Sequence, residues 1–96
     1  MPVVQLEHPV SDFALWKAAF DRDPIGRRGL GVRRHRIVRP VDDPDYVVVE
    51  LEFRTTEEAE RCRAALGRLW ASREAAPALA GAPQTRIVEA VEDHVY

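Results

Sequence analysis

Residues 32 to 53 read VRRHRIVRPVDDPDYVVVELEF, and this stretch predicts a single β-hairpin. Both arms alternate as half-buried strands do, and VDDPD (41 to 45) has the composition of the loop between them. With that loop, Arg positions in the first arm lie opposite Glu positions in the second. Cross-strand pairs of opposite charge stabilise a register by about 0.2 to 1 kcal/mol each. The predicted pairs are Arg36 with Glu50, Arg34 with Glu52, and Val38 with Val48.

This register divides the hairpin into an apolar face and a charged face. Successive side chains of a strand point to opposite sides of the sheet, so alternate residues share a face. We expect the apolar face to lie under the helices of the fold. It carries Val47, Val49, Leu51, Phe53, Ile37 and His35, whereas the opposite face carries Arg34, Arg36, Glu50 and Glu52.

Upstream of the hairpin, the sequence predicts a strand, a helix and a loop. Residues 2 to 8 alternate between apolar and polar side chains as a strand does. Ser11 is the expected N-cap of a helix over residues 11 to 22, in which aromatic residues recur at helical spacing. The segment PIGRRGLG (24 to 31) holds three of the five glycines and predicts the loop that leads into the hairpin.

Downstream, the pattern T-x-x-E formed by Thr55 and Glu58 is a capping box, which predicts the start of a second helix. A last strand is expected from residue 84 to at most residue 95. The element order is then β-α-β-β-α-β, which predicts an α+β, ferredoxin-like domain over residues 1 to 96: a four-stranded antiparallel sheet with two helices on one face. The inner stripe predicted for the second helix is Ala59, Cys62, Leu66, Leu69 and Trp70.

Composition narrows the class of protein. A chain of 96 residues with 46% hydrophobic residues forms one small domain, and pairing with a second copy would cover its remaining apolar surface. The formal net charge of −2 argues against nucleic-acid and anionic-membrane partners. The single Cys62 excludes an internal disulfide, and no run of residues has the length and apolarity of a signal or membrane segment. We expect a cytoplasmic protein.

Three motifs are spread over nearly the whole chain: HPVSDFALWKAAF (8 to 20), DDPD (42 to 45) followed by VVVELEF, and TTEEA (55 to 59). Through these motifs the chain resembles the dimeric α/β-barrel superfamily, which includes antibiotic-biosynthesis-monooxygenase-like proteins and small cyclase-like proteins. The resemblance implies a homodimer in which two sheets pack through their helix-free faces, with a pocket between sheet and helices in each subunit. Residues 70 to 83 depart from the family pattern and are given no family role.

The candidate catalytic residues are His8 and His35. Strand alternation places both on the face that the helices should cover, and a histidine in an apolar pocket can act as a general base near neutral pH. A structural explanation stays open, in which His8 is partly solvated at a strand end and His35 is a satisfied edge-strand residue.

The candidate substrate-binding residues are Trp16, Phe13 and Phe20, whose helical spacing suits stacking against a flat ring. Aromatic residues at this spacing more often belong to an ordinary core, and the two explanations are compatible because a pocket in this fold is a hollow within the core. In the glycine-rich loop, Arg27 and Arg28 suggest an anion cradle or a lid over the pocket. Their motif matches neither the phosphate-loop nor the dinucleotide pattern, so a solvated loop is the alternative.

Neither the charged face of the hairpin nor the residues that could bind a metal favour a catalytic role. The charged face could be a cluster of catalytic acids and bases, formed by Arg34, Arg36, Glu50 and Glu52. Their mutual pairing instead favours a surface that contacts the second subunit of a dimer. The three histidines lack the spacing of a metal site, and no haem-ligand motif is recognised, so no cofactor is expected.

Two functions remain open at this point. The first is a cofactor-independent monooxygenase or cyclase-like enzyme that holds an apolar or aromatic small molecule between helices and sheet. The second is a non-catalytic homodimeric module that binds a small molecule or has a structural or stress-related role. An open cavity in contact with His8 or His35 supports the first, whereas a core filled by aromatic side chains supports the second.

Overall fold

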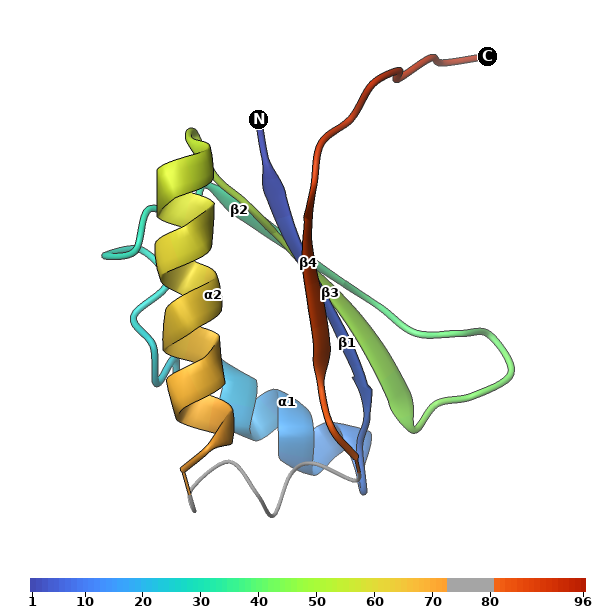
Figure 1. Ribbon diagram of the computed structural model, residues 1–96. Coiled ribbons are helices and arrows are strands. Elements are labelled where there is room, and N and C mark those ends of the chain that lie inside the picture. Colours follow the sequence, from blue (N-terminus) through green and yellow to red (C-terminus); the bar gives the residue numbers. More distant parts are fainter. Residues whose placement is uncertain (73–80) are drawn as a thin grey trace.

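The computed structural model describes residues 1 to 72 and 81 to 96. Their elements follow the predicted β-α-β-β-α-β order (Figure 1). Within the described residues, no helix is long and apolar enough to cross a membrane. The elements are β1 (Val3–Pro9), α1 (Phe13–Asp21), β2 (Arg34–Val38), β3 (Tyr46–Glu52), α2 (Thr56–Trp70) and β4 (Gln84–Val88).

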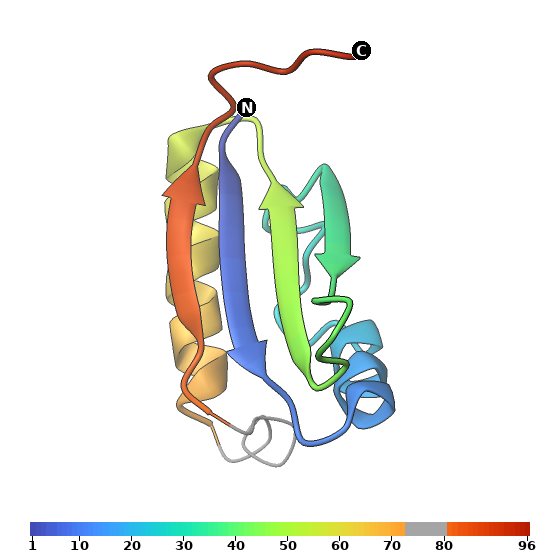
Figure 2. The ribbon, with the colours of Figure 1, turned by 90° about the vertical axis from the view of Figure 1, so that its right-hand side faces the viewer.

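The strands form one antiparallel sheet in the order β2-β3-β1-β4. Both helices cover the same face and leave the other face bare, as the edge-on view of Figure 1 and the face-on view of Figure 2 show together. This is the ferredoxin-like architecture that the sequence predicted. The predicted hairpin register is confirmed, since Arg36 pairs with Glu50, Arg34 with Glu52 and Val38 with Val48.

The core lies between the sheet and the helices. β1 and β3 both alternate between partly buried and buried residues, and their buried sides face the helices. The predicted inner stripe of α2 is confirmed at its first three positions, which are fully buried or nearly so, whereas Leu69 and Trp70 are half-buried. The buried core residues are Val4, Leu6, Val10, Trp16, Val47, Val49, Leu51, Phe53, Ala59, Cys62 and Leu66.

The helix caps agree with the prediction for α2 and differ for α1. In α2 the capping box is complete, since Glu58 N–H donates to Thr55 Oγ1 at 3.1 Å and Thr55 N–H donates to Glu58 Oε1 at 3.2 Å. The prediction that Ser11 caps α1 is wrong. Asp12 is the N-cap, with extended backbone and a carboxylate that accepts the Leu15 N–H at 3.0 Å.

The last strand begins at Gln84 as predicted and ends at Val88, within the predicted limit. Residues 89 to 96 have no regular structure and lead away from the sheet (Figures 1 and 2). Three large apolar side chains of this segment are exposed to solvent: Val91, Val95 and Tyr96.

Candidate functional site

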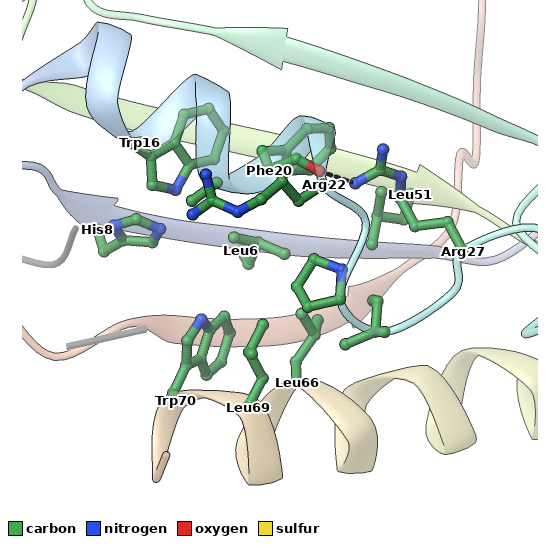
Figure 3. A pocket seen from close by; sticks show the side chains of 13 residues that line it. Leu6, His8, Trp16, Phe20, Arg22, Arg27, Leu51, Leu66, Leu69 and Trp70 are labelled. Atoms are coloured by element: carbon green, nitrogen blue, oxygen red, sulfur yellow. Dashed lines mark hydrogen bonds between the residues drawn. The ribbon is translucent and has the colours of Figure 1, made fainter. Parts of the chain in front are cut away.

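A cavity of about 120 Å³ lies between the two helices and the sheet and is open on one side (Figure 3). Its walls come from β1 and β3, from α1 with the loop that follows it, and from the inner stripe of α2. Most of the lining side chains are apolar. The lining residues are Leu6, His8, Trp16, Ala19, Phe20, Arg22, Pro24, Ile25, Arg27, Leu51, Leu66, Leu69 and Trp70.

The aromatic wall of this pocket comes from α1. Residues four apart lie on the same side of a helix, so Trp16 and Phe20 stack on one another with ring centroids 5.2 Å apart. Phe13 extends the row, at 5.9 Å from Trp16, but it does not line the cavity. Instead, its ring lies beneath the Arg39 guanidinium, 4.3 Å from the ring centroid. Of the three aromatic residues predicted to bind substrate, two therefore line the pocket.

His8 stands at one end of the pocket, between two indole rings. It points to the helix side of β1 together with Val4 and Leu6, and only 1% of its surface is exposed. Its ring meets Trp16 and Trp70 edge to face, with centroids 5.9 and 6.5 Å away (Figure 3). The sequence-based alternative of a partly solvated histidine at a strand end is therefore wrong.

The hydrogen bond of His8 fixes its tautomer. The Nδ1 atom lies 2.9 Å from the carbonyl oxygen of Pro9, and a carbonyl can only accept, so Nδ1 carries the proton. Burial lowers the pKa of His8 below its ordinary value of 6.5, and the bond to Pro9 offsets this only in part. The ring is therefore neutral near pH 7, and Nε2 keeps a lone pair that can accept a proton.

His35 lies elsewhere. It faces Leu51 across the hairpin as predicted, but the expectation that the helices cover it is wrong, because β2 is an edge strand and His35 is exposed. Its ring meets that of Phe20 edge to face, with centroids 5.3 Å apart. It does not line the pocket of His8 and borders a hollow on the other side of the sheet. The two histidines therefore do not share a site.

The candidate site residues did not include most of the lining, and Arg22 and Trp70 are the two omitted residues with the most distinctive chemistry. Trp70 lies four residues after Leu66 on the inner stripe of α2, so its position was predictable but its role at the pocket was not. Arg22 is the C-cap of α1 and gave no signal in the sequence. Figure 3 shows its side chain extending across the pocket in the direction of Trp16.

The glycine-rich loop closes the other end of the pocket with Pro24, Ile25 and Arg27. Arg27 is fixed in place: its guanidinium donates to the Phe20 carbonyl at 2.8 Å and lies 3.8 Å from the centroid of the Phe20 ring. Its Nε also lies 3.5 Å from a carboxylate oxygen of Asp23. Arg28 does not line the pocket, so the two arginines do not form the anion cradle considered from the sequence.

The helix-free face carries a row of polar side chains that crosses all four strands. Arg36 lies 3.7 Å from Glu50, Glu50 accepts a bond from Gln5 at 3.2 Å, and Gln5 accepts one from Arg86 at 2.7 Å. Of the two predicted charge pairs, Arg36 and Glu50 are within ion-pair distance, whereas Arg34 and Glu52 lie opposite in the register without forming an ion pair. A hollow of about 130 Å³ on this face is lined by Val3, Arg34, His35, Arg36, Glu50 and Glu52.

The remaining reactive side chains do not add to the pocket. Cys62 is buried, and burial raises the pKa of its thiol to about 11, so it is a neutral core residue. Among the described residues, no group of three His, Cys, Asp or Glu side chains is placed to hold a metal ion.

Comparison with known proteins places the fold. No protein-family model matches the sequence, and no curated protein matches it either. Among solved structures, a "Putative antibiotic biosynthesis monooxygenase from Nitrosomonas europaea" superposes with a TM-score of 0.71 at 20% identity, over 96% of this chain and 100% of that one.

Two further solved structures superpose on this chain over nearly its whole length. A protein of unknown function from Nitrosomonas europaea has a TM-score of 0.69 at 15% identity, over 99% of this chain and 93% of that one. A dimeric ferredoxin-like protein from an uncultured marine organism has a TM-score of 0.68 at 11% identity, over the whole of both chains. The chain therefore has the ferredoxin-like fold of these monooxygenase-like and dimeric proteins.

Proposed function

We propose that this protein is a small homodimeric enzyme of the cofactor-independent monooxygenase type, which binds an aromatic small molecule in the pocket and uses His8 as its base. One observation carries the proposal. A neutral histidine, whose Nε2 lone pair meets no donor among the described residues, stands between two indole rings at the end of an open, mostly apolar cavity. The structural neighbour that is named a putative antibiotic biosynthesis monooxygenase supports the same reaction class.

The proposed reaction needs only the substrate, dioxygen and a base. His8 Nε2 removes a proton from a carbon that a phenol ring or carbonyl makes acidic, and the apolar walls exclude water from the resulting carbanion. The electron-rich carbanion reduces dioxygen and forms a C–O bond to it, and His8 returns the proton to give a hydroperoxide. Loss of water leaves a C=O group, so a CH₂ group and O₂ become C=O and H₂O. Trp16 and Phe20 would orient the ring of the substrate.

The proposed dimer uses the helix-free face of the sheet. This face carries half-buried apolar residues beside the polar row, and a second copy would bring the same charges in reverse order across a two-fold axis. Arg and Glu would then pair between subunits as well as within each one. Support comes from the structural neighbour that is described as dimeric and ferredoxin-like. The apolar residues of this face are Val3, Val38, Val48 and Val88.

Binding can be measured with the two tryptophans of the chain, because both line the pocket. Polyphenols and polyketide-like diketones that occupy the cavity should quench nearly all of the tryptophan emission after correction for absorbance. Trp16→Phe should weaken binding, whereas the matched change Phe13→Leu, beside the pocket but outside its lining, should leave the Kd within about twofold. Equal effects of the two changes would show that the ligand binds elsewhere.

Turnover is tested by oxygen consumption with any compound that binds. His8→Asn keeps an amide donor near the position of Nδ1 but lacks the Nε2 base, so it should retain binding and lose at least about a hundredfold in rate. The control His35→Asn should keep full activity. If the wild type binds ligands without consuming oxygen or converting them, the protein is the non-catalytic binding module instead.

A further inference from the structure

We infer that the pocket selects an aromatic acid, and that Arg22 binds its carboxylate while the ring lies against Trp16 and Phe20. This inference rests on the proposed binding function and names the class of its ligand. The observation behind it is the charge of the lining. The described residues that line the pocket include two arginines, Arg22 and Arg27, and no Asp or Glu.

The two arginines differ in how far their charges are compensated. Arg27 is paired with Asp23 at 3.5 Å, donates to the Phe20 carbonyl and has only 16% of its side chain exposed. It therefore acts as a structural clamp between the loop and α1. Arg22 is exposed, and none of the carboxylates in residues 1 to 72 and 81 to 96 forms an ion pair with it. Within the part of the chain that the structure describes, the pocket thus has one positive charge that no ion pair neutralises.

The Arg22 side chain is placed to contact a molecule in the cavity. Its backbone N–H donates to the carbonyl of Ala18 at 3.3 Å, and the N–H of the next residue, Asp23, donates to the carbonyl of Phe20 at 3.0 Å, so the start of the Arg22 side chain is fixed relative to the aromatic wall. From there the side chain extends across the cavity in the direction of Trp16 (Figure 3). A guanidinium binds a planar carboxylate through two parallel N–H···O bonds, which fixes orientation as well as charge.

The volume of the cavity limits the size of the aromatic ligand. Apolar cavities of roughly 150 Å³ hold a benzene molecule, so a cavity of about 120 Å³ with one open side suits a single aromatic ring. A carboxylate on that ring would meet Arg22, and the ring itself would lie against the apolar walls of the cavity. Since the lowered pKa keeps His8 neutral near pH 7, Arg22 is the group in the pocket that supplies an uncompensated positive charge to the carboxylate, and His8 stays available as a base.

The test compares two compounds of the same shape, 4-hydroxybenzoate and 4-hydroxybenzamide, by tryptophan quenching near pH 7. The wild type should bind the carboxylate at least about tenfold more tightly than the amide, in line with a charge-assisted hydrogen-bond pair. Arg22→Gln should remove this preference and leave the Kd of the amide unchanged, which also shows that the pocket is intact. Arg28→Gln is the matched control, because it removes the same charge nearby but outside the lining, and it should keep the preference.

Each other outcome contradicts the inference at a different level. Equal affinity of the wild type for both compounds would overturn the anion site and leave the aromatic pocket standing. A loss of both affinities in Arg22→Gln, or an equal loss of preference in Arg28→Gln, would show that Arg22 has only a structural or a general electrostatic effect. Binding of neither compound would overturn the inference together with the proposed function.

Discussion

At the scale of single residues, the environment of His8 decides what the pocket can do. Strand alternation correctly predicted its side of the sheet, because alternate residues of β1 must share a face. The same argument placed His35 on that face but could not say how far the helices reach. β2 lies at the edge of the sheet, and His35 stays exposed despite its ring contact with Phe20, so one histidine is buried and the other is solvated.

The lowered pKa of His8 predicts how stability depends on pH. In the unfolded chain His8 titrates near 6.5, whereas burial lowers its pKa in the fold. Below pH 6.5 the unfolded state therefore binds the proton more readily, and the free energy of unfolding should fall as the pH drops toward the folded pKa. The loss is at most about 1.4 kcal/mol for each pH unit in that window and is absent above pH 6.5.

Urea unfolding between pH 7.5 and 5.5 measures this effect, and the difference between wild type and His8→Asn isolates it from the carboxylates. NMR titration of the ring should give a pKa below 6.5 and the tautomer with Nδ1–H. A titration at or above the ordinary value would mean that His8 is solvated or paired with an anion, contrary to its surroundings in the pocket.

At the scale of elements, local chemistry explains most of what the sequence predicted. The hairpin register followed from opposite charges at opposed positions, and the start of α2 followed from a reciprocal pair of side-chain to backbone bonds. The start of α1 was harder to predict, because Ser11 and Asp12 are both good N-cap residues in adjacent positions. The geometry of the backbone before Phe13 selects Asp12, and composition alone cannot determine this.

The capping box of α2 gives a prediction at this scale. Thr55→Ala removes the acceptor for the Glu58 N–H and should lower the free energy of unfolding by about 1 kcal/mol. Its exposed neighbour Thr56 is the first residue of the helix, so Thr56→Ala is a matched control that should change stability by less than about 0.5 kcal/mol. Equal urea midpoints for the two variants would contradict the assigned cap.

At the scale of the whole molecule, the two faces of the sheet differ. The face under the helices holds the core and the pocket, and the helix-free face holds the polar row and its valines. Sequence patterns predicted both faces. They could not predict the pocket lining, because it depends on where the loop after α1 and the end of α2 come to rest over the sheet. Arg22 and Trp70 join the site only through that placement.

The proposed dimer can be tested by a substitution that introduces a charge on the helix-free face of the sheet. The wild type should sediment with twice the 10.9 kDa mass of one chain. Val48→Arg places an uncompensated charge in the middle of that face and should yield monomers, whereas Val41→Arg, in the exposed hairpin loop, should remain dimeric. A wild type that is monomeric at micromolar concentration would contradict the proposed assembly.

Binding of an aromatic ring in the cavity between helices and sheet can be observed directly by isotope-filtered NMR of the protein with a bound hydroxylated aromatic compound. This measurement reports which side chains touch the ring. A ring that occupies the cavity should show contacts from its protons to Trp16, Trp70 and Leu66. Contacts confined to the hollow beside Arg34 and Glu52, or an absence of any contact with the two indoles, would contradict binding in this cavity.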